Sequence, residues 1–128
     1  MKTVLALLIG FTLAASAQPR RGWEHLGDAT VDGAVDHDRI VVTGAKGEFR
    51  AIRLRVENAA VKFDHVVVHY ANGSSNPIDI RRKISAGGET RVIDLPGDRR
   101  VIESVEFWYE RGNQRNPARP RVALFGMR

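Results

Sequence analysis

Basic side chains give this sequence its strongest chemical signal, the binding of anions. The candidates alternate along apolar segments or follow a Pro-Gly turn: Arg53, Arg55, Arg81, Lys83, Arg99 and Arg100. Alternate residues of a strand share one face, so neighbouring strands of this kind would present a basic stripe. Arginine binds phosphate and carboxylate groups through paired hydrogen bonds. Two interpretations stay open: the stripe binds an anionic ligand, or its members pair with acids such as Glu57 and Asp79 across strands.

Trp108 is the candidate for contact with a sugar or a partner. Its parity is opposite to that of Val105, Phe107 and Tyr109, so it lies on the outer face beside Glu106 if those three form the core. An exposed tryptophan can stack on a sugar ring or anchor a protein partner. The alternative is burial beneath the polar segment 111–120, since monomers rarely expose large aromatic side chains.

Metal binding has weak candidates in four clustered aspartates, Asp28, Asp32, Asp36 and Asp38. Calcium requires six to eight oxygen ligands, but this spacing does not match the calcium-binding loop, and turn-capping aspartates explain the cluster as well. His65 and His69 lie about 13 Å apart if they belong to one strand, too far to bind one ion. We therefore predict no metal site.

Catalysis has no recognisable constellation. The sequence has no cysteine and no Gly-x-Ser-x-Gly motif. Glu103 and Glu106 would serve glycoside hydrolysis only if two carboxyl groups face each other at a suitable separation. We predict a protein that is not an enzyme and uses no cofactor, with an envelope hydrolase as the weaker alternative.

Short apolar runs separated by turn residues must position these side chains. Residues 49–56 alternate as a half-buried strand, the phase changes in residues 61–70 and predicts a bulge near Asp64-His65, and Asn72-Gly73 marks a turn. Residues 90–109 predict a β-hairpin or a sheet corner around Pro96-Gly97-Asp98, whereas residues 28–39 read as a loop or a weakly paired strand. The pattern predicts an antiparallel β-sandwich of seven to eight short strands, or alternatively a small β-barrel.

The N-terminal residues predict export. Lys2, the apolar run 4–13 and Ala15-Ser16-Ala17 are typical of a cleaved signal peptide over residues 1–17. Residues 18–22 then form a disordered lead, and residues 23–128 form one domain. The apolar run is about half the length needed to span a bilayer, and no later run spans one. We predict a periplasmic or extracellular protein with no membrane span after cleavage.

One long ordered block carries a family resemblance. Arg91-x-Ile93-Asp94-Leu95-Pro96-Gly97 continues to Arg100-x-Ile102-x-x-Val105-x-Phe107-x-Tyr109, with Trp23-x-x-Leu26-Gly27 before it and Val122-x-Leu124-x-Gly126 after it. This block resembles a family of small exported bacterial domains of unknown function, over about residues 23–126. The resemblance implies export and a compact β domain, and it brings no activity, ligand or catalytic residue.

The formal net charge of +5 adds a class of partner to this interpretation. A basic exported protein meets anionic envelope polymers before nucleic acid, so we predict no nucleic-acid partner. The predicted function is a non-enzymatic binding module for anionic polysaccharide or lipid headgroups. The alternative is a structural or protein-interaction module that docks an envelope protein through edge strands or Trp108.

Overall fold

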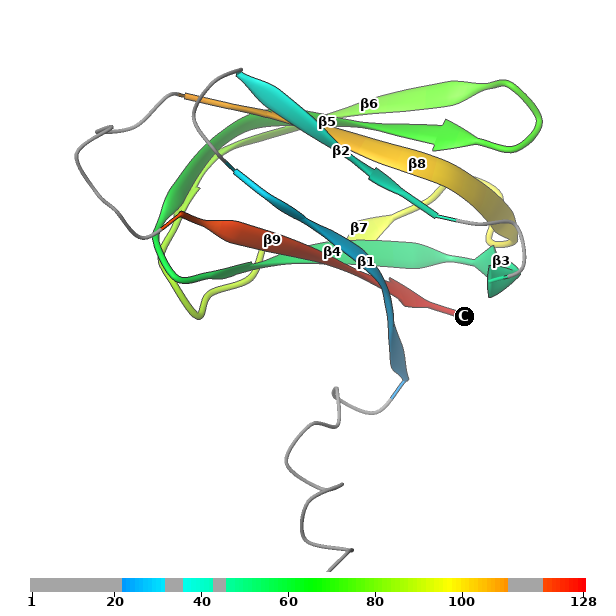
Figure 1. The fold of residues 1–128 in the computed structure, drawn as a ribbon. Coiled ribbons are helices and arrows are strands. Elements are labelled where there is room, and N and C mark those ends of the chain that lie inside the picture. Colours follow the sequence, from blue (N-terminus) through cyan, green and yellow to red (C-terminus); the bar gives the residue numbers. More distant parts are fainter. Residues whose placement is uncertain (1–21, 32–35, 43–45, 111–118) are drawn as a thin grey trace, which may run out of the picture.

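The computed structural model describes residues 22–31, 36–42, 46–110 and 119–128. The predicted signal peptide and residues 18–21 of the predicted lead lie outside these ranges. Nine strands make up the described chain (Figure 1). They are β1 (Trp23–Thr30), β2 (His37–Val41), β3 (Glu48–Phe49), β4 (Ala51–Glu57), β5 (Val61–Tyr70), β6 (Ser75–Ile84), β7 (Ile93–Asp94), β8 (Arg100–Tyr109) and β9 (Arg121–Met127).

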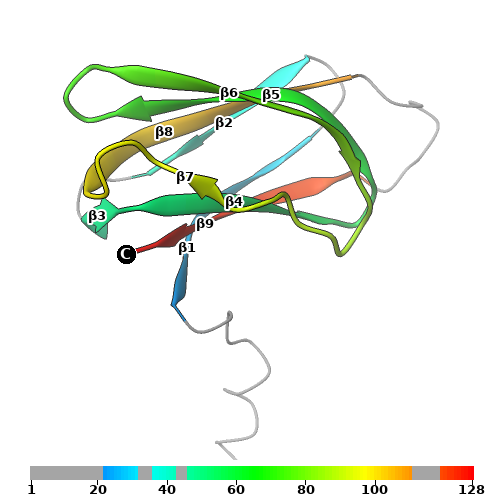
Figure 2. The ribbon, with the colours of Figure 1, turned by 180° about the vertical axis from the view of Figure 1, so that it is seen from behind.

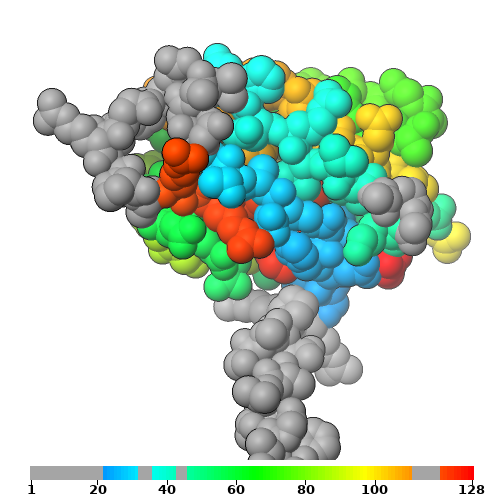
Figure 3. Space-filling model, in the orientation of Figure 1, coloured from blue at the N-terminus to red at the C-terminus, as the bar shows by residue number. Residues whose placement is uncertain are grey.

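The strands form two antiparallel sheets that lie face to face as the layers of a sandwich (Figures 1 and 2). One sheet has the order β1-β9-β4-β7, and the other has the order β2-β8-β5-β6, with β3 paired to the start of β8. β1 and β2 belong to different sheets and lie side by side at the surface (Figure 3). The predicted β-sandwich is therefore confirmed. The alternative, a small β-barrel, is wrong because the strands form two separate sheets.

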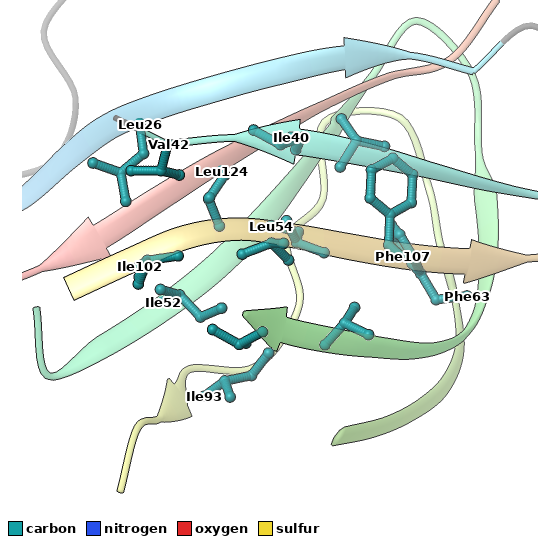
Figure 4. Close-up of a cluster of buried hydrophobic side chains, with 14 of the residues drawn as sticks. Leu26, Ile40, Val42, Ile52, Leu54, Phe63, Ile93, Ile102, Phe107 and Leu124 are labelled. Atoms are coloured by element: carbon teal, nitrogen blue, oxygen red, sulfur yellow. The ribbon is translucent and has the colours of Figure 1, made fainter. Parts of the chain in front are cut away.

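Alternation along each strand sends one set of side chains into the space between the sheets. In β4, Ile52, Leu54 and Val56 are completely buried, as the period of the sequence predicts. They belong to one core cluster with Phe63 of β5 and Phe107 of β8, whose ring centroids lie 5.9 Å apart with planes at 66° (Figure 4). This edge-to-face arrangement adds to the stabilisation from burial. The intervening residues of β4 are consequently directed to the outer surface.

Residues 90–109 form a sheet corner and not a hairpin. β7 pairs with β4 in one sheet, whereas β8 pairs with β2 and β5 in the other, so the chain changes layers between them (Figure 2). The change occurs at Pro96-Gly97-Asp98, where Gly97 and Asp98 have φ angles of 93° and 61°. Glycine adopts this left-handed conformation without steric cost, which explains its position in the turn.

The β5–β6 hairpin contains the predicted turn and the predicted bulge. Gly73 has a φ of 90°, and the Ser74 backbone N–H donates to the Asn72 side chain at 3.0 Å. The pairing of β5 with β8 shifts between Phe63 and His65, which confirms the bulge. Against β5, the β6 strand carries an extra residue of its own beside Arg81, whose φ is 44°. β6 lies at one edge of its sheet, and β2 lies at the other.

The segment 28–39 is predicted to be a loop or a weakly paired strand, but both of its ends belong to strands; residues 32–35 lie outside the described ranges. β1 continues to Thr30 through a regular pairing with β9, and β2 already begins at His37. The aspartates of this segment interrupt the alternation of apolar and polar residues that identifies a strand, so the sequence does not reveal these strands. Backbone pairing of β1 with β9 and of β2 with β8 forms the strands despite the missing pattern.

Candidate functional site

The cations predicted to form one stripe lie on two different sheets. Arg53 and Arg55 belong to β4, whereas Arg81 and Lys83 belong to β6. These strands are not neighbours in either sheet, so a continuous stripe across all four residues is wrong. The error has a physical reason, because strand alternation fixes the face of a residue but not the neighbour of its strand.

Arg53 and Arg55 have acidic partners on the outer face of the first sheet. Arg53 is largely buried, with its guanidinium 4.3 Å from the centroid of the Trp23 ring and its Nε 2.8 Å from a Glu89 carboxylate oxygen. Arg55 is half-exposed and lies 3.6 Å from Glu57. Both arginines therefore pair with acids, but not across strands as the second interpretation expected, because Glu57 belongs to β4 itself and Glu89 follows β6.

Arg99 ends the turn before β8 and Arg100 begins β8, near the tip of the β5–β6 hairpin. Arg100 stacks over the Tyr70 ring at 3.7 Å and donates to the Pro96 carbonyl at 3.0 Å and to the Ser74 hydroxyl at 3.1 Å. These contacts fix the turn against the hairpin. Arg99 is exposed.

Three exposed cations gather on one face at the other end of the hairpin and are called here the cation cluster: Lys62, Arg81 and Lys83. Arg82, also exposed, is opposite the buried Phe63 and lies on the other face of the sheet. Lys62 of β5 and Lys83 of β6 are directly opposite each other in the register. Lys62 lies 3.2 Å from Glu110, and Arg81 lies 3.7 Å from Asp79, in highly exposed ion pairs. Among the described residues, Lys83 has no carboxylate partner. Cations therefore exceed carboxylates in the cluster, and exposed pairs of this kind contribute little stability.

The outer face of the same sheet carries a row of three aromatic rings across β2, β8 and β5. His37 and His65 are the register partners of Trp108 on its two sides. Their imidazoles stack on the Trp108 ring, with centroids 5.0 Å and 4.4 Å away and planes at 17° and 10°. Trp108 lies on the outer face as predicted, but imidazoles cover both of its ring faces. A sugar ring cannot stack on Trp108 without displacing a histidine.

Beside this row, Glu106 lies within ion-pair distance of three basic side chains. His69 Nε2 lies 2.6 Å from Glu106 Oε1, Arg39 Nη2 lies 3.2 Å from the same oxygen, and His37 Nε2 lies 4.0 Å from Oε2. Burial, the largest single influence, acts to raise the pKa of Glu106, but the hydrogen bonds and charges of His69 and Arg39 together outweigh it. The pKa of Glu106 is consequently lowered from its ordinary value of 4.5.

We call this outer surface of β2, β8 and β5 the histidine face; its residues are His37, Arg39, His65, His69, Glu106 and Trp108. The sequence placed Glu106 beside Trp108 but left His37, Arg39, His65 and His69 without a role. Alternation could have put His65 and His69 on one face. Their approach to Trp108 depends on the pairing of β5 with β8, which are far apart in the sequence.

The aspartates considered for calcium are dispersed. Asp28 pairs with Arg121 at 2.6 Å, Asp38 accepts a hydrogen bond from the Tyr109 hydroxyl at 2.7 Å, and Asp36 contacts His37 at 3.1 Å. Asp32 lies outside the described residues. Within the ranges that the structure covers, no three acidic or histidine side chains are grouped so that they could hold a metal ion.

No helix within the described ranges has the length and apolar character needed to cross a bilayer.

Comparison with known proteins identifies the family but not an activity. No curated protein matches the sequence. A solved structure of Pseudomonas aeruginosa AlgX is similar, with a TM-score of 0.54 and 12% identity over 82% of this chain and 27% of that chain. At this identity the likeness shows the fold alone.

The family match covers nearly the whole chain and confirms the resemblance seen in the sequence. The model of the domain of unknown function DUF2541 matches residues 3–126, which include both sheets and the connecting corner. The chain therefore belongs to the DUF2541 family.

Proposed function

We propose that this protein is an exported, non-enzymatic module that binds an anionic polymer through the cation cluster on β5 and β6. The observation that carries the proposal is the direct opposition of Lys62 and Lys83, two exposed side chains of like charge. Like charges opposite each other on neighbouring strands destabilise a sheet. A bound polyanion would relieve this repulsion. The signal-peptide pattern at residues 1–17 supports export.

The surroundings of the cluster support the same assignment. Arg81 lies two residues before Lys83 in β6, and the irregularity at Arg81 occurs where β6 carries its extra residue. Bulges redirect side chains and are common at functional edges of sheets. Arg53 and Arg100 do not belong to this proposed site, because their guanidinium groups already contact other residues of this chain.

The predicted alternatives have less support. Both ring faces of Trp108 are covered, which leaves only the ring edge for a protein partner. β6 is an outermost strand, but Pro77 deprives it of one backbone donor for pairing with a partner strand. Glu106, one of the two carboxylates considered for hydrolysis, is bound to Arg39 and His69.

Charge reversal in the cluster tests the proposal. Arg81→Glu/Lys83→Glu is compared with the unchanged protein in co-sedimentation with insoluble polygalacturonate and with phosphatidylglycerol vesicles. Neutral cellulose and phosphatidylcholine vesicles are the neutral counterparts. Binding to one anionic probe identifies polysaccharide or lipid as the source of the negative groups. Affinity should fall steeply between about 50 and about 200 mM salt, because a polyanion releases counterions when it is bound.

The matched control reverses the same amount of charge elsewhere. Arg55→Glu/Arg99→Glu changes two exposed arginines that lie outside the cluster. We expect the cluster variant to bind at least about tenfold more weakly, since two attractions become repulsions, and the control to lose much less. Equal losses in both variants would show that net charge alone matters. No binding to either anionic probe would reject the proposed function.

A further inference from the structure

We infer that the histidine face extends the anion site across the sheet and makes the affinity for a polyanion increase as the pH falls. The inference rests on the proposed function, because it concerns the regulation and extent of the same site. The ligand it describes is a linear polyanion that crosses the strands from β6 to β2. Such a chain would contact the cation cluster at one end and the histidine face at the other.

The two surfaces are continuous. His65 lies three residues along β5 from Lys62, and its register partners are Asp79 on β6 and Trp108 on β8. The next partner of Trp108 is His37 on β2. Three strand spacings separate β6 from β2, roughly 14 Å. A polymer of several charged units can span this distance and touch both surfaces.

Each histidine of the face has a carboxylate within contact distance. His37 lies 3.1 Å from Asp36, and His65 lies 2.6 Å from Asp64. His69 lies 2.6 Å from Glu106. While the imidazoles are neutral, these carboxylates give the face negative charge and repel a polyanion. Protonation of the three imidazoles adds up to three positive charges and removes that repulsion.

The charged groups around the histidines come from all four strands and from the residue before β2. They are Asp36, Arg39, Asp64, Asp79, Arg81 and Glu106. Four of these six are acidic, so histidine charge decides whether the face attracts or repels an anion. Histidine is the side chain whose charge ordinarily changes between about pH 8 and pH 5. The exported compartment exposes a protein to such changes in external pH.

Trp108 keeps the histidines in place for this role. The side chains of His37 and His65 remain 43% and 31% exposed although each stacks on the indole ring. Stacking fixes the planes of both imidazoles and leaves part of each ring open to solvent. The positive charges would thus appear at defined points of the surface.

Binding to immobilised dextran sulfate, whose charge is constant over this range, tests the inference at pH 7.5 and 5.5. The comparison includes the unchanged protein, His37→Asn/His65→Asn/His69→Asn and the single variant His65→Asn, which guards against misfolding of the triple variant. His25→Asn is the matched control, since His25 is a half-exposed histidine next to Asp28 on the other sheet. Circular dichroism at both pH values confirms that each variant is folded.

We expect the unchanged protein and His25→Asn to bind roughly tenfold more tightly at pH 5.5, the combined effect of three modest exposed charge interactions. The triple variant should lose most of this gain, and His65→Asn should lose part of it. Binding that is salt-sensitive but equal at both pH values would overturn the inference and leave the proposed function intact. A pH effect that survives in the triple variant would also overturn it. Failure to bind at either pH would instead reject the proposed function.

Discussion

The guanidinium of Arg53 lies 4.3 Å from the centroid of the Trp23 ring, and the same side chain forms an ion pair with Glu89 at 2.8 Å. It therefore joins β1, β4 and the segment that follows β6. We expect Arg53→Ala to lower the free energy of unfolding by about 1–3 kcal/mol, because a largely buried cation–π contact and an ion pair are both lost. Urea unfolding followed by circular dichroism measures the change.

Arg55→Ala is the control for this prediction. Arg55 is half-exposed and lies 3.6 Å from Glu57, so its removal should change the free energy of unfolding by less than about 0.5 kcal/mol. Equal effects of the two substitutions would contradict a structural role that is particular to Arg53.

Gly126, near the end of β9, leaves no room for a side chain. A Cβ atom at this position would lie 2.7 Å from Phe49 Cδ1 and 2.8 Å from Leu26 Cδ1. Gly126→Ala should lower the free energy of unfolding by about 1–3 kcal/mol through overpacking. Chemical denaturation checks this value. Adding Phe49→Leu to the variant should restore part of the loss if the contact with the ring is the cause, and no recovery would point elsewhere.

Thr90 satisfies two backbone groups through one buried hydroxyl. Its Oγ1 accepts from the Leu54 N–H at 3.0 Å and donates to the Arg91 carbonyl at 2.9 Å. Thr90→Val should cost about 1–3 kcal/mol, because the buried hydrogen-bonding groups lose their partner. Thr90→Ser keeps the hydroxyl and should lose less stability. Thermal and urea unfolding of the pair decide the question, and a valine variant as stable as the serine variant would contradict it.

Glu106 should make stability depend on pH in the acid range. Its pKa is lowered in the folded protein from an ordinary value of 4.5. The unfolded chain therefore binds the proton more tightly, so the contribution of Glu106 is fully present above the unfolded pKa and is lost as the pH falls through the folded pKa. Free energies of unfolding measured from pH 6 to pH 3 should fall less steeply for Glu106→Gln than for the unchanged protein.

Glu103→Gln provides the comparison for this pH dependence. Glu103 is exposed and, within the described part of the chain, forms no ion pair. Its substitution should leave the slope of stability against pH close to that of the unchanged protein. Identical slopes for both variants and the unchanged protein would show that the contacts of Glu106 with His69 and Arg39 do not stabilise the fold.

Local sequence patterns predict the faces of strands well and their neighbours poorly. The alternation of Ile52, Leu54 and Val56 is sufficient to place β4 against the core, because every second residue of a strand shares a face. The turn at Pro96-Gly97-Asp98 is equally visible. Its sequence does not decide between a hairpin and a corner, since that choice depends on whether β7 pairs with β8 or with β4.

In the candidate site, too, the sequence predicts which face a residue occupies but not which strands are neighbours. Parity alone places Trp108 outside the core, and it identifies Arg81 and Lys83 as surface cations. The histidines that stack on Trp108 come from strands separated from it by about 40 and about 70 residues along the chain, and register between such strands is a property of the whole fold. The separation of Arg53 from Arg81 into different sheets has the same origin.

The position of β6 at the margin of its sheet has a consequence for the protein in concentrated solution. An outermost strand offers unpaired backbone groups on which another chain can add a strand, the first step of aggregation. Pro77, the irregular backbone at Arg81 and three consecutive cations all oppose such an addition. Neutral replacements in this strand would remove that protection together with the positive charge, whereas glutamates would retain mutual repulsion between molecules. Solubility at this margin thus constrains which side chains β6 can carry, whatever the strand binds.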